Sequence, residues 1–177
     1  IVVGSSRHGP IGRVLLGSVG ASLLHGSPCA VAVAPTRLAA HHSIRRIGVG
    51  FDGSPEAFSA LEAAISLARR LDDGASLDLF TAWEQPAYGI GTSSAILSAS
   101  DWYGVERDEK QRILNLGLAR VPADLTARGH LLSGNAGVGL TDAAGDADLM
   151  LVGSRGYGPL RRTLVGSTAE HLLHGAS

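Results

Sequence analysis

Glycines near the C-terminal end of the sequence have a spacing that suits the binding of phosphate groups. The segment Gly153-Ser154-Arg155-Gly156 is followed, after nine further residues, by Gly166-Ser167. Glycines let backbone N–H groups approach a phosphate closely, and they permit the positive φ angles of a phosphate-binding loop. Gly166-Ser167 opens a predicted helix, whose free amides and positive dipole end favour an anion. The pattern therefore predicts an anion site. It is not a Walker A loop, because the lysine of that motif is missing.

The same glycine pattern occurs a second time near the N-terminal end. Gly4-Ser5-Ser6-Arg7 is followed after nine residues by Gly17-Ser18, and the match continues without a gap to Leu23-Leu24-His25-Gly26 on residues 172–175. A match of this length indicates an internal duplication. The first copy has Arg7 where the second copy has Gly156. Because a long side chain there would keep a phosphate away from the backbone, we expect the first copy to be a degenerate site.

Composition favours a folded domain over a nucleic-acid-binding, membrane or disulfide-rich protein. Of the 177 residues, 45% are apolar, which is enough to form a hydrophobic core. A chain of this length corresponds to one domain, or to one domain and part of another. A net charge of −1 gives no reason to expect a nucleic-acid partner. No apolar run approaches the roughly 18–20 residues that span a bilayer. The single cysteine, Cys29, excludes an internal disulfide and fits a reducing compartment, so we expect a cytoplasmic protein.

Apolar runs and turn residues divide the sequence into two α/β parts. Residues 1–3 and 30–34 are predicted as short strands, and residues 13–24 as a helix that ends at Gly26. The chain starts inside a strand-like run, and its only methionine is Met150, so we expect it to be cut from something longer. The predicted organisation is the C-terminal part of one domain (1–35), a linker (36–45), and a second domain (46–177) that lacks its last strand.

The second part begins with a complete β-α-β unit. Strand 47–51 ends at Asp52-Gly53, and Ser54-Pro55 is typical of a helix start, with the serine hydroxyl as N-cap. Helix 56–71 has one apolar stripe at helical spacing, formed by Leu61, Ala64, Ile65, Ala68 and Leu71. Strand 77–82 follows. This order of elements implies a right-handed crossover and a parallel sheet.

Further elements alternate towards the C-terminal end. Residues 86–100 are rich in Gly, Ser and Ala and too long for an ordinary connection, so this segment is expected to be functional or mobile. Asp101 is expected to cap a helix that runs to about residue 120. Strand 130–133, a short helix 134–144, strand 148–152 and a helix from Ser167 complete the prediction.

These segments together resemble the universal stress protein family, specifically a tandem member with two such domains in one chain. Three pieces carry the resemblance: residues 49–54 at the end of the first strand, Ala147-Asp148 with the strand that leads to residues 153–156, and Gly166-Ser167. The resemblance implies a Rossmann-like α/β fold of the adenine nucleotide α-hydrolase type. Its open, five-stranded parallel sheet would have the strand order 3-2-1-4-5. Ligands bind such sheets at the crevice where the strand order reverses.

The resemblance also implies an ATP site that is occupied together with Mg²⁺. Carried over position by position, its cofactor-binding residues are Gly50, Phe51, Asp52, Ala82, Val152, Gly153, Arg155, Gly156, Gly166, Ser167 and Thr168. Asp52 would accept a hydrogen bond from a ribose hydroxyl or the adenine amine, and Ala82 would contact the base through its backbone. Arg155, Arg161 and Arg162 would be near enough to neutralise phosphate charge. No catalytic and no metal-ligating residues are assigned.

Several of these residues also have ordinary structural interpretations. Ser167-x-x-Glu170 is a capping box in which Ser167 would be the N-cap. Gly153, Gly156 and Asp52 could be turn formers. His171 and His174 lie one helical turn apart, but no third metal ligand is evident, so helix-end histidines are favoured. Trp102 and Tyr103 are expected to anchor the preceding loop on the core, rather than to cover a ligand or seal a dimer.

The sequence thus predicts an ATP-binding universal stress protein with a regulatory or sensing role in stress response, and at most slow ATP turnover. Two alternatives remain at this stage: a family member that binds no nucleotide and acts through dimerisation, and an ATP-cleaving enzyme of the same fold. We also expect one nucleotide per chain. The last strand of the second domain, 148–152, would have an open edge, which favours pairing of the tandem domains or a homo-oligomer.

Overall fold

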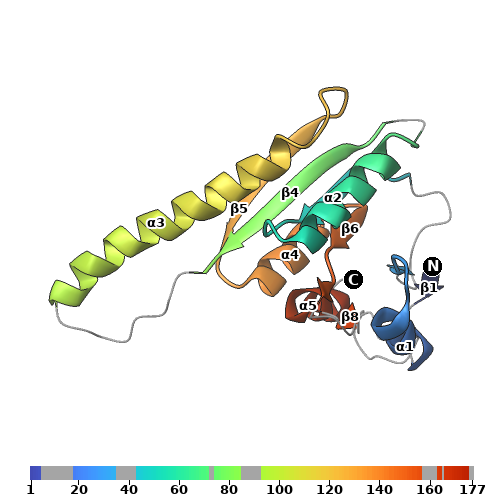
Figure 1. Ribbon diagram of the computed structural model, residues 1–177, viewed down its shortest axis with the longest axis horizontal. Coiled ribbons are helices and arrows are strands. Elements are labelled where there is room, and N and C mark those ends of the chain that lie inside the picture. Colours follow the sequence, from blue (N-terminus) through green and yellow to red (C-terminus); the bar gives the residue numbers. More distant parts are fainter. Residues whose placement is uncertain are drawn as a thin grey trace.

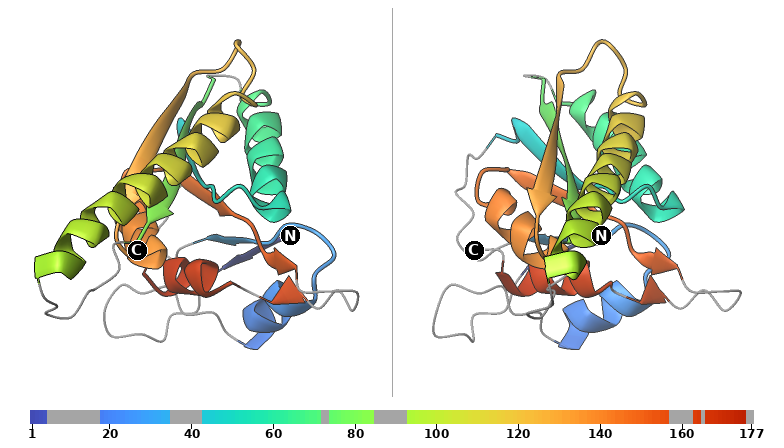
Figure 2. Two further views of the ribbon diagram at one scale, coloured as in Figure 1. Left: turned by 60° about the vertical axis from the view of Figure 1, so that its left-hand side comes forward. Right: turned by 90° about the vertical axis from the view of Figure 1, so that its left-hand side faces the viewer.

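A computed structural model describes residues 1–4, 18–34, 43–71, 74–84, 93–156, 163–164 and 166–175. Figure 1 shows a sheet covered by helices, from which one end of the long helix α3 (Ser93–Leu118) projects. In the right-hand view of Figure 2 the sheet lies between α2 (Pro55–Ala68) and α3 on one side and α4 (Ala136–Ala144) on the other. We call the side covered by α2 and α3 the first face. The side covered by α4 and α5 (Ser167–Gly175) is the second face.

The central sheet is parallel and has the strand order that the sequence predicts. Its four strands are β3 (Arg46–Gly50), β4 (Ser76–Trp83), β5 (Ala127–Ser133) and β6 (Leu149–Val152), and they lie in the order β5-β4-β3-β6. This is the order 3-2-1-4 of the expected five-stranded sheet. Among the described residues no further strand pairs with the outer edge of β6.

The N-terminal segment forms a second, smaller sheet. Strand β1 (Val2–Gly4) pairs in parallel with β2 (Ala32–Ala34), and α1 (Ser18–Gly26) lies between them in the sequence. Both predicted strands and the end of the predicted helix at Gly26 are therefore confirmed. Residues 5–17, which include Arg7, and residues 36–42 of the predicted linker (36–45) lie outside the described residues.

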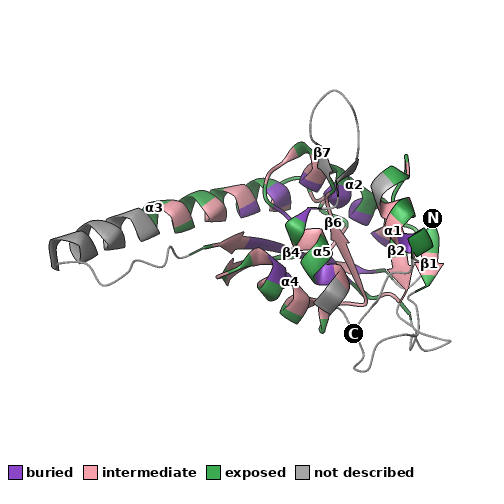
Figure 3. Cartoon of the chain, turned by 90° about the horizontal axis from the view of Figure 1, so that it is seen from below, coloured by how far each residue is buried: buried purple, intermediate pink, exposed green. Residues whose placement is uncertain are grey.

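The first face carries the larger hydrophobic core. Helix α2 starts as predicted: the Ser54 hydroxyl accepts a hydrogen bond from the Ala57 N–H (3.1 Å), and Pro55 occupies the first turn. The apolar stripe of α2 is buried against residues of β3 and β4, with Ile47, Val49, Leu61, Leu77 and Leu79 fully enclosed. Figure 3 shows buried residues on α2 and on β4, whereas the described part of α3 is mostly intermediate or exposed. This core holds β3 and β4 in register.

Fewer residues form the core of the second face. Phe80 of β4, Leu140 of α4 and Leu172 of α5 are its buried members. Helix α4 begins at Asn135, whose Oδ1 accepts hydrogen bonds from the N–H groups of Gly137 (2.9 Å) and Val138 (3.2 Å). A nine-residue helix covers only part of a strand, so the ends of β4 and β5 extend beyond it.

The structure differs from the sequence analysis at two places: one prediction is wrong, and one pair of strands was not predicted. Helix α3 begins at Ser93, so Asp101 lies inside the helix and does not cap it. Residues 93–100 contain Ser, Ala, Ile and Leu but neither Gly nor Pro, and the helix therefore propagates through them. The remainder of the expected long connection, 85–92, lies outside the described residues. The second difference is a two-stranded antiparallel ladder after Gly153, formed by β7 (Arg155–Gly156) and β8 (Thr163–Leu164).

Candidate functional site

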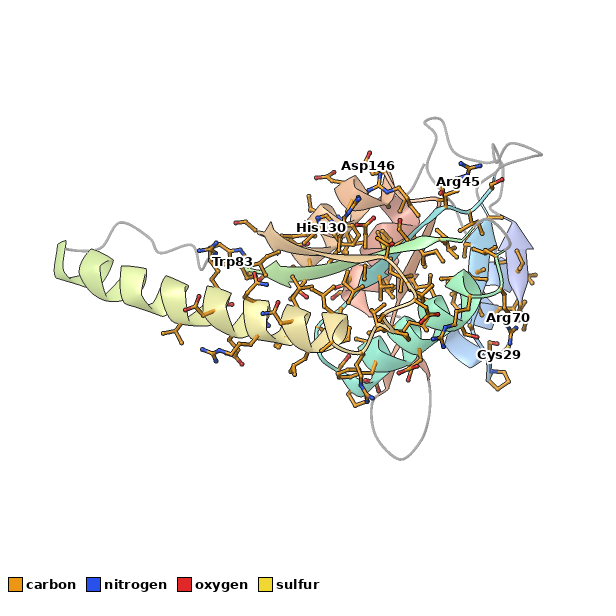
Figure 4. All side chains as sticks on the ribbon, turned by 90° about the horizontal axis from the view of Figure 1, so that it is seen from above. Cys29, Arg45, Arg70, Trp83, His130 and Asp146 are labelled. Carbon is orange, nitrogen blue, oxygen red and sulfur yellow. The ribbon has the colours of Figure 1, made fainter. Side chains whose placement is uncertain are left out.

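Polar residues follow the carboxyl ends of three neighbouring strands. Asp52 comes after β3, Glu84 after β4 and Asn135 after β5. The strand ends are aligned: Gly50 pairs with Phe80 and with Val152, and the Phe51 N–H donates to the Phe80 carbonyl at 2.8 Å. Figure 4 shows Trp83 at this end of the sheet and Arg45 at the opposite end. The reversal of strand order lies here too, since β3 stands between β4 and β6.

A cavity of about 420 Å³ opens at the carboxyl ends of these strands. It is lined by Asp52, Ala82, Glu84, Glu106, Lys110, Asn135, Ala136, Gly137, Ser167, Thr168 and His171. These residues come from the ends of the strands and from α3, α4 and α5, so the cavity is enclosed by segments far apart in the sequence. Its volume lies within the range of small-molecule sites.

Four of the predicted cofactor-binding residues meet in this cavity: Asp52, Ala82, Ser167 and Thr168. Asp52 also has the predicted alternative role of a turn former. Its Oδ1 accepts hydrogen bonds from the Ser54 N–H (2.9 Å) and the Ser54 hydroxyl (2.5 Å). The turn is completed by Gly53, whose φ of +80° is one that other residues rarely adopt. These bonds fix the carboxylate at the rim of the cavity.

Three further predicted residues pack behind the cavity wall. The side chain of Phe51 is buried in the core of the first face, where its ring meets that of Phe58 edge to face at 5.0 Å. Gly50 and Val152 are paired in register, and a Cβ on Gly50 would lie 3.0 Å from side chains of Leu140 and Val152. Gly50, Phe51 and Val152 therefore contribute to packing within the domain, and none of the three lines the cavity.

The glycines of the predicted phosphate loop have different surroundings. A Cβ on Gly153 would lie 2.7 Å from the backbone carbon of Glu56, so this glycine allows the chain after β6 to pass the first turn of α2. Arg155 and Gly156 form β7, in which Gly156 pairs with Thr163. Residues 157–162, with Arg161 and Arg162, lie outside the described residues.

The capping-box interpretation of Ser167 is wrong. The carbonyl of Gly166 accepts the first helical hydrogen bond of α5, from the Glu170 N–H at 2.8 Å. Gly166 therefore occupies the N-cap position, and Ser167 is the first helical residue. The first-turn amides, including those of Ser167 and Thr168, have no partner within the helix. They lie beside the cavity, where the positive end of the helix dipole favours an anion.

Sequence reasoning missed most of the cavity lining from β4, α3 and α4. Glu84, Asn135 and Gly137 would have been found by taking the first residues after every strand, because parallel strands end at one edge. Glu106 and Lys110 lie one turn apart on α3 and share a helix face. A Cβ on Gly137 would lie 2.7 Å from that of His171, so this glycine sets the close contact between α4 and α5.

The remaining predictions concern two histidines, two aromatic residues, and metal or membrane binding. His171 lines the cavity, whereas the side chains of His174, Trp102 and Tyr103 lie outside the described residues. Within the described part of the chain, no group of three or more His, Cys, Asp or Glu side chains is arranged to hold a metal ion. The described helices include none that is both long and apolar enough to cross a bilayer.

Comparisons with known proteins agree with this architecture. A model of the universal stress protein family matches residues 1–35 and 43–177. The chain is 31% identical over 187 residues to the universal stress protein Rv2005c of Mycobacterium tuberculosis, covering 99% of this chain and 58% of that protein. The chain thus spans less than two thirds of the length of this curated relative.

Two solved structures show the same fold. The functionally unknown protein PA1789 from Pseudomonas aeruginosa superimposes with a TM-score of 0.67 at 20% identity, over 99% of this chain and 59% of its own. A universal stress protein solved in complex with cAMP gives a TM-score of 0.53 at 20% identity, over 76% of this chain and 93% of its own.

Proposed function

The chain belongs to the universal stress protein family, which has a role in stress response, and we propose that its cavity binds ATP in a regulatory or sensing role. The observation that carries the proposal is the meeting of Asp52, Ala82, Ser167 and Thr168 around one cavity. These residues come from three distant parts of the sequence. The structure with cAMP supports an adenine nucleotide as the class of ligand, since that protein shares the fold.

The polarity of the cavity supports one orientation of the nucleotide. The first-turn amides of α5 and the Ser167 hydroxyl are hydrogen-bond donors, and they would hold the phosphates. Asp52 and Ala82 lie at the ends of β3 and β4, where they would contact the ribose and the base. Lys110 contributes a positive charge from α3. The carboxylates of Asp52 and Glu84 follow the ends of β3 and β4, and their charge would repel phosphates placed in the reverse orientation.

Mg²⁺ would enter this site with the nucleotide. It prefers oxygen ligands, keeps several waters, and is usually held by phosphates and one or two carboxylates. Phosphate oxygens and water would be its ligands here, and no side chain of the cavity is assigned to it. The metal would neutralise phosphate charge, and the protein would contribute orientation through the α5 amides.

An ATP-cleaving enzyme and a nucleotide-free dimerising protein are the alternatives to a binding role. The proposed protein takes up ATP stoichiometrically with little turnover, whereas an enzyme would release ADP or AMP steadily. A purely structural member would do neither. Identifying any nucleotide released on denaturing the purified protein, followed by a turnover assay, separates the three. ATP binding also fits a cytoplasmic location, with which the single cysteine is compatible.

The proposed assembly is a pairing of tandem domains, or of two copies, through strand edges. The outer edge of β6 has no strand beside it in the described part of the chain. Such an edge is a template for pairing with another strand. The two stretches that match the family model, 1–35 and 43–177, support the tandem arrangement with a short linker. Sedimentation at micromolar concentration tests it, because a stable monomer would show that the edge is protected in another way.

A substitution taken from the first copy tests the ATP site. Gly156→Arg introduces the residue type of the equivalent position, Arg7, and we expect it to abolish ATP binding while the fold remains intact. Gly104→Arg is the matched control, because a Cβ on Gly104 meets open space on α3. Calorimetry should show one ATP per chain for the wild type and the control. Unchanged affinity in Gly156→Arg would remove the glycine loop from the site.

A further inference from the structure

One side chain that lines the cavity is a carboxylate held by a hydrogen bond. Glu84 follows β4 two residues after Ala82, and both residues line the cavity. Its Oε1 accepts a hydrogen bond from Asn135 Nδ2 at 3.3 Å. This contact joins the end of β4 to the start of α4.

The orientation of the Asn135 amide is fixed by the helix that it caps. Its Oδ1 already accepts the N–H groups of Gly137 and Val138, so its NH₂ group must be the end that faces Glu84. The contact therefore has one polarity, from the amide donor to the carboxylate. This chain of hydrogen bonds positions Glu84 before any ligand arrives, which lowers the ordering cost of binding.

A carboxylate in this position accepts hydrogen bonds and cannot donate them. Only one oxygen of Glu84 is bonded to Asn135, and the other has lone pairs available to a donor in the cavity. An amino group satisfies such an acceptor. A ring position that carries only hydrogen or a carbonyl oxygen does not, and the hydrogen bond to Glu84 would then be missing.

The geometry points to Glu84 as the residue that selects the base, by accepting a hydrogen bond from the exocyclic amino group of adenine. This inference rests on the proposed function, because it requires the phosphates to lie at α5 and the base at the end of β4. It goes beyond the backbone contact expected of Ala82, since it assigns discrimination between bases to a side chain. Asn135 is the positioning residue for this contact.

The test compares ATP with its 6-deamino analogue, purine riboside triphosphate, which has hydrogen in place of the amino group. Calorimetry of both nucleotides is carried out on the wild type, on Glu84→Ala, and on Glu106→Ala as a matched control from the same cavity. We expect the wild type to prefer ATP by roughly tenfold or more, the usual effect of one hydrogen bond to a charged group. Glu84→Ala should reduce that preference to within about twofold, while Glu106→Ala keeps it.

The alternative outcomes separate the inference from the proposed function. If Glu84→Ala weakens both nucleotides equally, Glu84 contacts the sugar or the phosphates and the inference is wrong. A preference that survives in Glu84→Ala, or that is lost in Glu106→Ala instead, would also overturn it while ATP binding stands. If the wild type binds neither nucleotide, both the inference and the proposed function fail. Glu84 is exposed and outside both hydrophobic cores, so its substitution leaves the fold intact.

Discussion

The two faces of the sheet are packed in different ways. On the first face, α2 and α3 enclose a continuous core that includes Leu61, Leu77 and Leu79. On the second face, the buried hydrophobic members are Phe80, Leu140 and Leu172. The cavity lies at the edge of the sheet where α3, α4 and α5 approach the strand ends. The first face therefore stabilises the strands, whereas the carboxyl ends of the strands beside the second face leave room for a ligand.

Among the described residues, the buried charged side chain lies on the second face. Asp78 of β4 is 2% exposed, and its Oδ1 lies 2.8 Å from His130 Nε2, while its Oδ2 accepts from Arg46 Nη2 at 3.3 Å. The His130 ring stacks on Phe80 with centroids 4.8 Å apart. A buried carboxylate is tolerated only when it is paired in this way. These polar contacts occupy the part of the second face towards the start of the strands, away from the cavity.

The largest expected effect is the loss of a large side chain from the first face. Leu61→Ala should lower the free energy of unfolding by about 2–5 kcal/mol, because Leu61 is fully enclosed and the cavity left behind cannot collapse. Leu172→Ala on the second face should cost less, since fewer buried groups surround it. Urea unfolding of both variants measures the difference. Equal decreases in the free energy of unfolding for the two variants would show that the two faces do not differ in this way.

Substitution of Asp52 has a smaller effect, on binding rather than on folding. Asp52→Ala should weaken ATP binding by about 1–3 kcal/mol, the usual cost of losing a hydrogen bond to a charged group. Asp52→Asn is the control, because its amide oxygen can still accept the Ser54 N–H and preserve the turn. Calorimetry should place Asp52→Asn between Asp52→Ala and the wild type. Wild-type affinity in Asp52→Ala would reduce this residue to a turn former.

The smallest expected effect concerns an exposed ion pair on the first-face side. Arg69, at the end of α2, donates to both carboxylate oxygens of Asp124 at 3.0 and 2.8 Å. The hydrogen bond from Arg69 lowers the pKa of Asp124 below its ordinary value. The stabilisation from this pair is therefore present above the pKa of the unfolded chain and is lost as the pH falls through the lower, folded-state pKa.

Asp124→Asn should accordingly reduce the urea midpoint only slightly at neutral pH, since exposed pairs contribute little. The difference from the wild type should vanish in acid, where both proteins lack the charge. Unfolding curves at several pH values between neutrality and acid measure this. A difference in urea midpoint that grows as the pH falls would contradict a stabilising role for the ionised Asp124 carboxylate.

The first-face core could be predicted from the sequence because it depends on regular patterns, whereas the strand order was predicted from the resemblance to a family. The stripe that includes Leu61 and Ile65 has helical spacing, and the strands are short apolar runs bounded by Gly and Asp. The start of α3 was misplaced because serines and alanines are compatible with both loops and helices. Helix α3 begins as early as Ser93, although no local signal in the sequence marks a helix start there.

The site was predictable only where a motif marked it. Asp52 and Ser167 were found from the resemblance to a family, and Ala82 from the same source. Glu84, Asn135 and Lys110 belong to no motif, and they meet only through the packing of α3 and α4 on the sheet. The role of Gly153 also depended on tertiary structure, because the contact that excludes a side chain is with Glu56 of α2.

An NMR titration of the protein with ATP and Mg²⁺ tests the central claim most directly, because it locates the ligand residue by residue. The account predicts saturable shifts in the backbone amides of Ala82, Glu84, Asn135, Ser167 and Thr168, with little change in Leu61, Ala64 and Ile65 of α2. Shifts that cluster on α2 or on the small sheet of β1 and β2, or no saturable shifts at millimolar ATP, would contradict it.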